Sequence, residues 1–199
     1  MKKYYCSITQ QVPDRLRKLI YASSDAALKR DEATAFPITA LIAGSTKKGE
    51  KIGIYAILPD HENSRANLEV LKAEIAELAK RVGFYYDLIL INTPFSENQD
   101  DHLDLFGKLI DTAEEGDNIY ADITYGTKPI PIIMLMSLTY TYRFRKDASV
   151  ERLCYGQVDH NTGRGEIFDV TAMFYMNCAL NAISESHDPK ALLKTMIEM

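Results

Sequence analysis

The sequence predicts an α/β fold with a mostly parallel sheet, helices on both faces and a C-terminal antiparallel strand pair. Three observations support this prediction. Strand-like and helix-like segments alternate along most of the chain. Residues 87–92 (Asp-Leu-Ile-Leu-Ile-Asn) are almost wholly apolar, as expected of a central parallel strand. Two strand-like segments at 150–155 and 165–169 are separated only by a turn, which indicates a hairpin at one edge.

Each predicted strand is a short apolar or alternating run bounded by turn residues. Residues 51–58 are a clear example, because Ile52, Ile54, Ile57 and Leu58 are apolar. In chain order, the predicted strands cover residues 4–9, 51–58, 87–92, 118–124, 150–155 and 165–169, with a turn at 160–164.

The best helix covers residues 63–82, because its apolar residues follow a three-four spacing and Gly83 suits its C-terminal end. Residues 14–30 are charged and helix-like but only weakly amphipathic. Further helices are predicted at 37–43, 102–115, 130–142, 170–183 and 189–199. This Rossmann-like order contains no repeat or linker, so we expect residues 1–199 to form a single domain that includes C-terminal helices at 170–199.

The composition is that of a soluble globular protein, with 46% hydrophobic and 26% charged residues. A net charge of −5 argues against a protein that coats duplex nucleic acid, which needs a broad basic surface. We see no signal peptide and no apolar window of about 18 residues, so we expect a cytoplasmic protein without a membrane segment in this chain. Cys6, Cys154 and Cys178 are too widely spaced for a CxxC pair and are expected to be buried thiols.

The most informative stretch of the chain is residues 119–131. An apolar strand leads into Asp122, and Thr124, Gly126, Lys128 and two prolines precede a very apolar segment. In an open α/β sheet, ligands bind where a strand ends and a helix begins. The first turn of a helix also offers unpaired N–H groups and the positive end of its dipole, which suit an anion. The stretch therefore predicts a site for a phosphate-bearing ligand.

Three loops should lie at the same edge of the sheet, because the carboxyl ends of parallel strands point the same way. They cover residues 7–12, 92–95 and 124–129. Hydroxyls, amides and one lysine suit phosphate oxygens and base edges better than a metal. The predicted ligand-binding residues are Ser7, Thr9, Gln10, Gln11, Asn92, Thr93, Thr124, Tyr125, Gly126, Thr127 and Lys128. Purely structural roles are the alternatives: turn residues for Thr9, Gln10 and Gly126, a local cap for Asp122, and a solvated lysine for Lys128.

The chain contains no motif for metal or nicotinamide chemistry. His61, His102, His160 and His187 form no catalytic or metal-binding pattern. The GxSxG, HExxH, P-loop and GxGxxG motifs are also absent from the sequence. We therefore expect neither a metal nor another cofactor.

Residues 122–129 (Asp-Ile-Thr-Tyr-Gly-Thr-Lys-Pro) resemble the Asp-x-Thr-His-Gly-x-Arg/Lys-x-x-Pro signature of CARF domains. These are the CRISPR-associated Rossmann-fold domains of type III CRISPR systems. Residues 150–157 and 165–171 resemble the closing strands of the family and the helix start beyond them, so the resemblance covers nearly the whole chain. Tyr125 stands where the family often has His, and the first loop lacks a glycine that is often found there.

The resemblance implies a homodimer that binds cyclic oligoadenylate across its two-fold axis, with cyclic tetra-adenylate (cA4) as the expected ring. An isologous dimer offers two copies of each loop to a symmetric ring. Ser7, Thr9, Gln10 and the loop 124–128 would hold ribose and phosphate, and Lys128 would lie closest to a phosphate. Asn92 and Thr93 would approach the base.

Two functions fit this resemblance. As a sensor domain, the chain would bind the messenger in antiviral signalling and pass a conformational change to a fused or separate effector. As a metal-independent ring nuclease, it would cut the ring to linear products with a 2′,3′-cyclic phosphate and switch the signal off. Lys128, Ser7 and Thr9 are then the catalytic candidates. The sensor is our primary hypothesis, and a small nucleotide-binding protein outside CRISPR biology is a third possibility.

Overall fold

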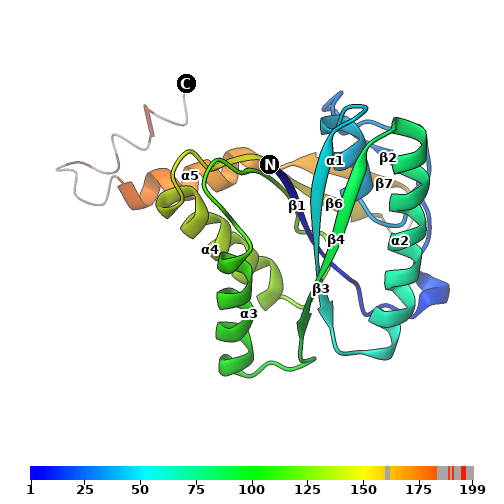
Figure 1. Ribbon diagram of the computed structural model, residues 1–199, viewed down its shortest axis with the longest axis horizontal. Coiled ribbons are helices and arrows are strands. Elements are labelled where there is room, and N and C mark those ends of the chain that lie inside the picture. The colour runs from blue at the N-terminus through cyan, green and yellow to red at the C-terminus, as the bar shows by residue number, and fades with distance from the viewer. Residues whose placement is uncertain (160–161, 183–187, 189, 191–193, 196–199) are drawn as a thin grey trace.

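A seven-stranded sheet with the order β2-β7-β6-β5-β1-β3-β4 forms the centre of the protein (Figure 1). The computed structural model describes residues 1–159, 162–182, 188, 190 and 194–195. Neighbouring strands run parallel, except that β6 and β7 are antiparallel, which confirms the predicted fold class. The strands are β1 (Lys2–Ser7), β2 (Tyr21–Ala22), β3 (Lys51–Pro59), β4 (Tyr85–Thr93), β5 (Asn118–Asp122), β6 (Ser149–Val158) and β7 (Gly165–Asp169).

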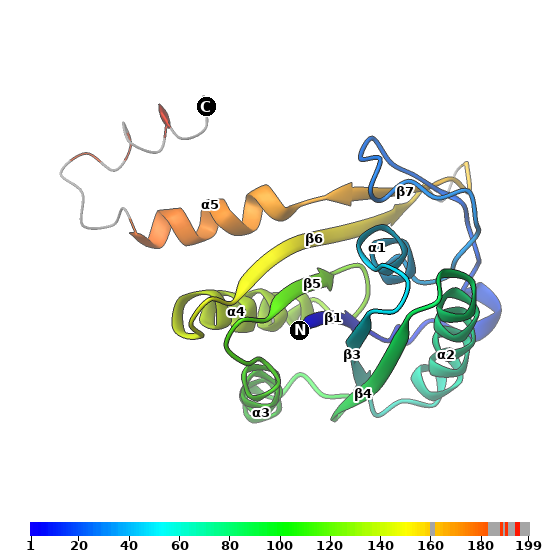
Figure 2. The ribbon, with the colours of Figure 1, turned by 45° about the horizontal axis from the view of Figure 1, so that its top comes forward.

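Helices cover both faces of this sheet. Figure 1 shows α1 and α2 on one side and α3 and α4 on the other, and Figure 2 shows α5 lying along β6 beside α4. The helices are α1 (Ile38–Ser45), α2 (Glu62–Val82), α3 (Gln99–Asp111), α4 (Pro129–Phe144) and α5 (Thr171–Ala182), with a 3-10 turn η1 at Pro13–Arg15. None of the helices among the described residues is long and apolar enough to cross a membrane.

The core consists of two hydrophobic clusters, one on each face of the sheet. Ile54 of β3 belongs to the cluster under α1 and α2, whereas Ile57 of the same strand belongs to the cluster under α3 and α4. Successive side chains of a strand point to opposite faces, so a central strand needs apolar residues at nearly every position. Cys6, Cys154 and Cys178 are buried and free, as predicted.

The helix predicted at residues 14–30 is wrong. This segment contains only η1 and the short strand β2, which pairs with β7. Leu19 and Thr34 also exchange backbone hydrogen bonds of 3.0 Å. Because the segment is only weakly amphipathic, a helix there would have no apolar face to bury, and extended backbone completes the edge of the sheet instead.

The element boundaries near the site follow from local hydrogen bonds. The imidazole Nδ1 of His61 accepts from the backbone N–H of Asn63 at 3.1 Å and caps the start of α2. β5 ends at Asp122, two residues earlier than predicted, because its carboxylate turns the chain by accepting from the N–H of Thr124. Most of the helix predicted at 189–199 and the start of the turn predicted at 160–164 lie outside the described residues.

Candidate functional site

The loops that follow β1 and β5 meet because these strands are neighbours. Tyr5 pairs with Ala121, so Ser7 lies level with the end of β5. A Cβ atom added to Gly126 would lie 3.3 Å from Ser7 Oγ and 2.9 Å from Ile130 Cβ. Gly126 has a φ of +119°, a conformation that favours glycine. The structure thus brings Ser7, Gly126 and the start of α4 into one place.

Lys128 is exposed at the start of this helix. No side chain caps α4, and Pro129 occupies its first turn. The N–H of Ile130 donates to the carbonyl of Thr127 at 2.9 Å, which closes the turn that carries Lys128. The ammonium group makes no ion pair or hydrogen bond with the described part of the chain. A free ammonium group beside the open end of a helix favours an anionic ligand.

Two buried polar atoms of the first loop have no hydrogen-bond partner among the described residues. They are Ser7 Oγ and Gln10 Nε2, and the Ser7 residue is only 1% exposed. Buried polar atoms are almost always hydrogen-bonded in native proteins, so an unpaired one needs an explanation. The Ser7 hydroxyl, which lies next to Gly126, and the Gln10 amide of the same loop are groups that a ligand rich in oxygen would satisfy.

The first loop is held from the other side by α2. The Nδ2 group of Asn67 donates to the carbonyls of Thr9 and Gln11, both at 2.9 Å, and that of Asn63 donates to the carbonyl of Gln10 at 3.1 Å. Asn67 is fully buried. These two asparagines were not predicted as site residues, although their spacing of four places them on one face of a helix.

Asp122 and Thr124 make the turn after β5 rigid. The carboxylate of Asp122, which is 2% exposed, accepts from both the N–H and the hydroxyl of Thr124. Burial raises the pKa of Asp122 to about 6, although hydrogen bonds from Thr124 and from the N–H of Ile38 act to lower it. The hydroxyl of Thr124 also accepts from the N–H of Gly156 on β6 at 2.7 Å. The Thr124 hydroxyl therefore already has a hydrogen-bond acceptor and a donor within the protein.

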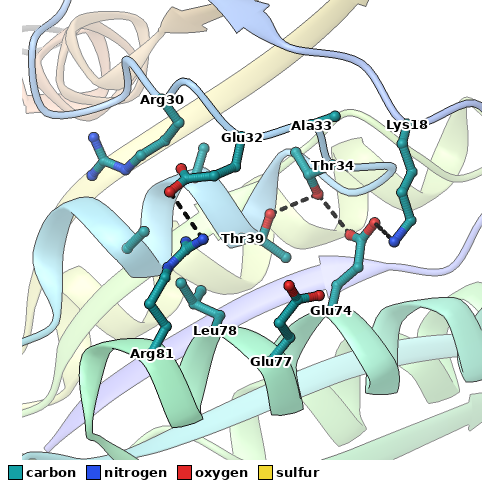
Figure 3. A pocket seen from close by; sticks show the side chains of 12 residues that line it. Lys18, Arg30, Glu32, Ala33, Thr34, Thr39, Glu74, Glu77, Leu78 and Arg81 are labelled. Carbon is teal, nitrogen blue, oxygen red and sulfur yellow. Dashed lines mark hydrogen bonds and ion pairs between the residues drawn. The ribbon is translucent and has the colours of Figure 1, made fainter.

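Tyr125 anchors the same loop to the segment before α1. Its hydroxyl donates to the carbonyl of Ala35 at 2.7 Å, and burial raises its pKa, so it stays a neutral donor. Figure 3 shows that Glu74 of α2 and the hydroxyl of Thr34 point toward each other, with 2.6 Å between the two oxygens, while Lys18 lies 3.4 Å from the same carboxylate. Glu74 also accepts from the N–H of Ala35. Tyr125 thus ties the start of the loop 124–128 to a segment that Glu74 of α2 holds in place.

Asn92 and Thr93 lie elsewhere along the same edge of the sheet. They end β4, which is two strands from β1 and three from β5, or about 10 and 14 Å away at about 4.8 Å per strand. They line a separate pocket of about 430 Å³ with Arg65 and Lys108. Lys108 donates to the carbonyl of Asn92 at 2.9 Å. The structure does not bring these two residues together with Lys128 in one chain.

A larger pocket lies on the β6 side of the loop 124–128. Its volume is about 780 Å³, and it includes three predicted residues and several that were not predicted. The predicted residues are Gln11, Thr124 and Tyr125, and among the others are Arg15, Arg17 and Tyr155. The arginines were missed because residues 14–30 were expected to form a helix.

Comparison with known proteins adds a limited similarity. No protein-family model matches the chain. A segment of 76 residues, 37% of the chain, is 32% identical to a CRISPR-associated protein of Methanocaldococcus jannaschii. The match covers 12% of that protein, so the chain spans only a small part of its length. The finding relates part of this chain to a CRISPR-associated protein.

Proposed function

We propose that this chain is a sensor domain in type III CRISPR antiviral signalling that binds cyclic oligoadenylate, with cyclic tetra-adenylate as the expected ring. The observation that carries the proposal is the unpaired Ser7 hydroxyl beside Gly126, two residues before the free Lys128 at the start of α4. The similarity to a CRISPR-associated protein supports the biological setting. The CARF-like motif at 122–129 supports the class of ligand.

The chemistry of the loops suits a ribose-phosphate backbone. Lys128 and the open N-terminus of α4 would hold a phosphate. The Ser7 hydroxyl can donate to or accept from a ribose 2′-hydroxyl, and the Gln10 amide can donate to a phosphate oxygen. Because Asn67 and Asn63 hold the backbone of the first loop, these groups stay in position before the ligand arrives.

An exposed apolar face on α4 supports a homodimer. Ile132 is 58% exposed and Met136 is 56% exposed, and their spacing of four places them on one side of the helix. On the neighbouring α5, Met173 and Met176 are also exposed. This apolar face begins one turn after Lys128, so a second copy packed against it would bring two Lys128 loops toward one shared ring.

The ring nuclease is a second candidate, because the Ser7 hydroxyl and Lys128 could orient a ribose and stabilise a developing charge. The geometry favours binding over cleavage. Asp122 is the only acid in the motif, and its carboxylate is occupied by Thr124. The motif therefore supplies no free carboxylate as a general base.

Incubation with cyclic tetra- and hexa-adenylate in EDTA tests the proposal, with calorimetry for binding and chromatography for the products. We expect tight binding with the ring intact, and weaker binding in Lys128→Ala and Ser7→Ala but not in the matched surface control Lys47→Ala. Cleavage that disappears in Lys128→Ala would establish the nuclease instead. If neither ring binds, the proposed function is wrong.

A further inference from the structure

A pocket of about 780 Å³ lies beside β6. The described residues that line it include two arginines and no carboxylate. Arg15 and Arg17 line it, and neither forms an ion pair or hydrogen bond through its side chain with the described part of the chain. The protein as a whole carries a net charge of −5, so two unpaired arginines in one hollow are unexpected. Their charge is available to an anion that enters the pocket.

Two other pockets show the contrast. In the pocket at the end of β4, Arg65 pairs with Asp60, and Lys108 lies 2.6 Å from Asp104. In the pocket between α1 and α2, three glutamates lie among the cations, and Figure 3 shows Arg81 directed at Glu32. The cations in these two pockets are largely neutralised within the protein, whereas those in the β6 pocket are not.

The β6 pocket also offers aromatic and amide groups beside its charge. Tyr155 is 39% exposed and lines the pocket, so part of its ring is open to a ligand. The buried Tyr21 and the half-buried Tyr125 form one wall, and Gln157 contributes an exposed amide. A volume of 780 Å³ lies within the range of about 300–1,000 Å³ that is usual for small-molecule sites.

We propose that this pocket is a second site, which binds a nucleoside monophosphate in each protomer. Arg15 and Arg17 hold the phosphate, since guanidinium groups match phosphate oxygens in pairs. The ring of Tyr155 stacks on the base, and the Gln157 amide contacts the base edge. Thr124 and Tyr125 line this site, whereas Ser7 and Lys128 do not, and the site does not depend on a cyclic ligand or a dimer.

Calorimetric titration with AMP, adenosine and inorganic phosphate tests this site directly. We expect the wild-type protein to bind AMP saturably and more tightly than adenosine or phosphate, because base and phosphate both contribute. The double variant Arg15→Ala/Arg17→Ala should bind AMP about a hundredfold more weakly, at about tenfold for each charged contact. Tyr155→Ala should bind about tenfold more weakly, whereas Tyr155→Phe keeps the ring and the affinity.

Two controls make the result specific. The double variant Lys72→Ala/Lys80→Ala removes the same charge from α2, and Lys128→Ala alters the other site, so both should bind AMP like wild type. AMP binding that is lost in Lys128→Ala but kept in Arg15→Ala/Arg17→Ala would overturn the second site, as would adenosine or phosphate binding as tightly as AMP. Failure of cyclic tetra-adenylate to bind affects only the proposed sensor function.

Discussion

Asp122 and Thr124 form a closed turn at the end of β5, in which the N–H of Thr124 lies 2.9 Å from Asp122 Oδ1 and its hydroxyl donates to the same oxygen. Gly156 of β6 donates to that hydroxyl in turn. The turn therefore joins two strands, and residues 125–128 leave it in a defined direction. The candidate site rests on this turn on one side and on the loop held by Asn67 on the other.

Asp122 should make the stability of the protein depend on pH. Burial raises its pKa from 3.8 to about 6, so the folded protein binds this proton more tightly than the unfolded chain does. Stability should then fall as the pH rises from about 4 to about 6, by about 3 kcal/mol in total. Burial also raises the pKa values of the neighbouring Cys6 and Cys154 thiols, so they stay neutral in this range.

The variant Asp122→Asn isolates this effect, because it cannot ionise. Urea unfolding at pH 4 and pH 7 should show the difference in stability between Asn and Asp shifting by about 2 kcal/mol in favour of Asn at the higher pH, because the unfolded carboxyl is already partly ionised at pH 4. Glu50 and Asp117, whose pKa values are lowered by Lys2 and Lys3, act equally in both proteins and cancel. Parallel pH profiles would show that Asp122 does not titrate in this way.

Gly126→Ala should damage the candidate site. The added Cβ would lie 2.9 Å from Ile130 Cβ, in a backbone conformation that is strained for alanine. We expect a loss of about 1–3 kcal/mol in the free energy of unfolding and the loss of ligand binding. Gly107→Ala is the matched control, since a Cβ there meets nothing within 4 Å in α3, and it should stabilise the protein by up to about 1 kcal/mol. Equal behaviour of the two variants in unfolding and binding would contradict the role of Gly126.

Asn67→Ala should loosen the first loop. It removes both hydrogen bonds to the carbonyls of Thr9 and Gln11, at an expected cost of about 1–3 kcal/mol. Hydrogen exchange of the amides in residues 8–12 should become faster even without ligand. Asn63→Ala loses a single longer bond and should have a smaller effect. Unchanged exchange in Asn67→Ala would show that other contacts hold the loop.

Ile132→Glu combined with Met136→Glu should prevent dimer formation, because it places two charges on the exposed apolar face of α4. Sedimentation should show a dimer for wild type and a monomer for the variant. Leu103→Glu changes a residue of α3 that is equally exposed and should leave the dimer intact. A monomeric wild-type protein would count against a ligand site on a two-fold axis.

Periodic and apolar segments were the parts of the fold that could be predicted. The apolar run at 87–92 and the one-sided helix at 63–82 correspond to β4 and α2, because such patterns are compatible with one kind of buried element. The helix predicted at residues 14–30 was wrong because the amphipathic pattern there is weak. Pairing of this segment with β7 and with Thr34 decided its conformation instead. Propensity is a weak guide where tertiary contacts compete with it.

The amino-acid sequence by itself determined the class of the fold and predicted the strand-to-helix stretch from Asp122 to Lys128 as a place for an anion. Local chemistry suffices for this, because turn residues, prolines and apolar runs act over a few positions. Only the tertiary structure decided which groups surround that stretch. The order of the strands places the loop with Ser7 beside Gly126 and leaves Asn92 and Thr93 at the far edge. It also brings Asn67, Arg15 and Arg17 to the loops, since contacts between distant segments depend on how the sheet is assembled.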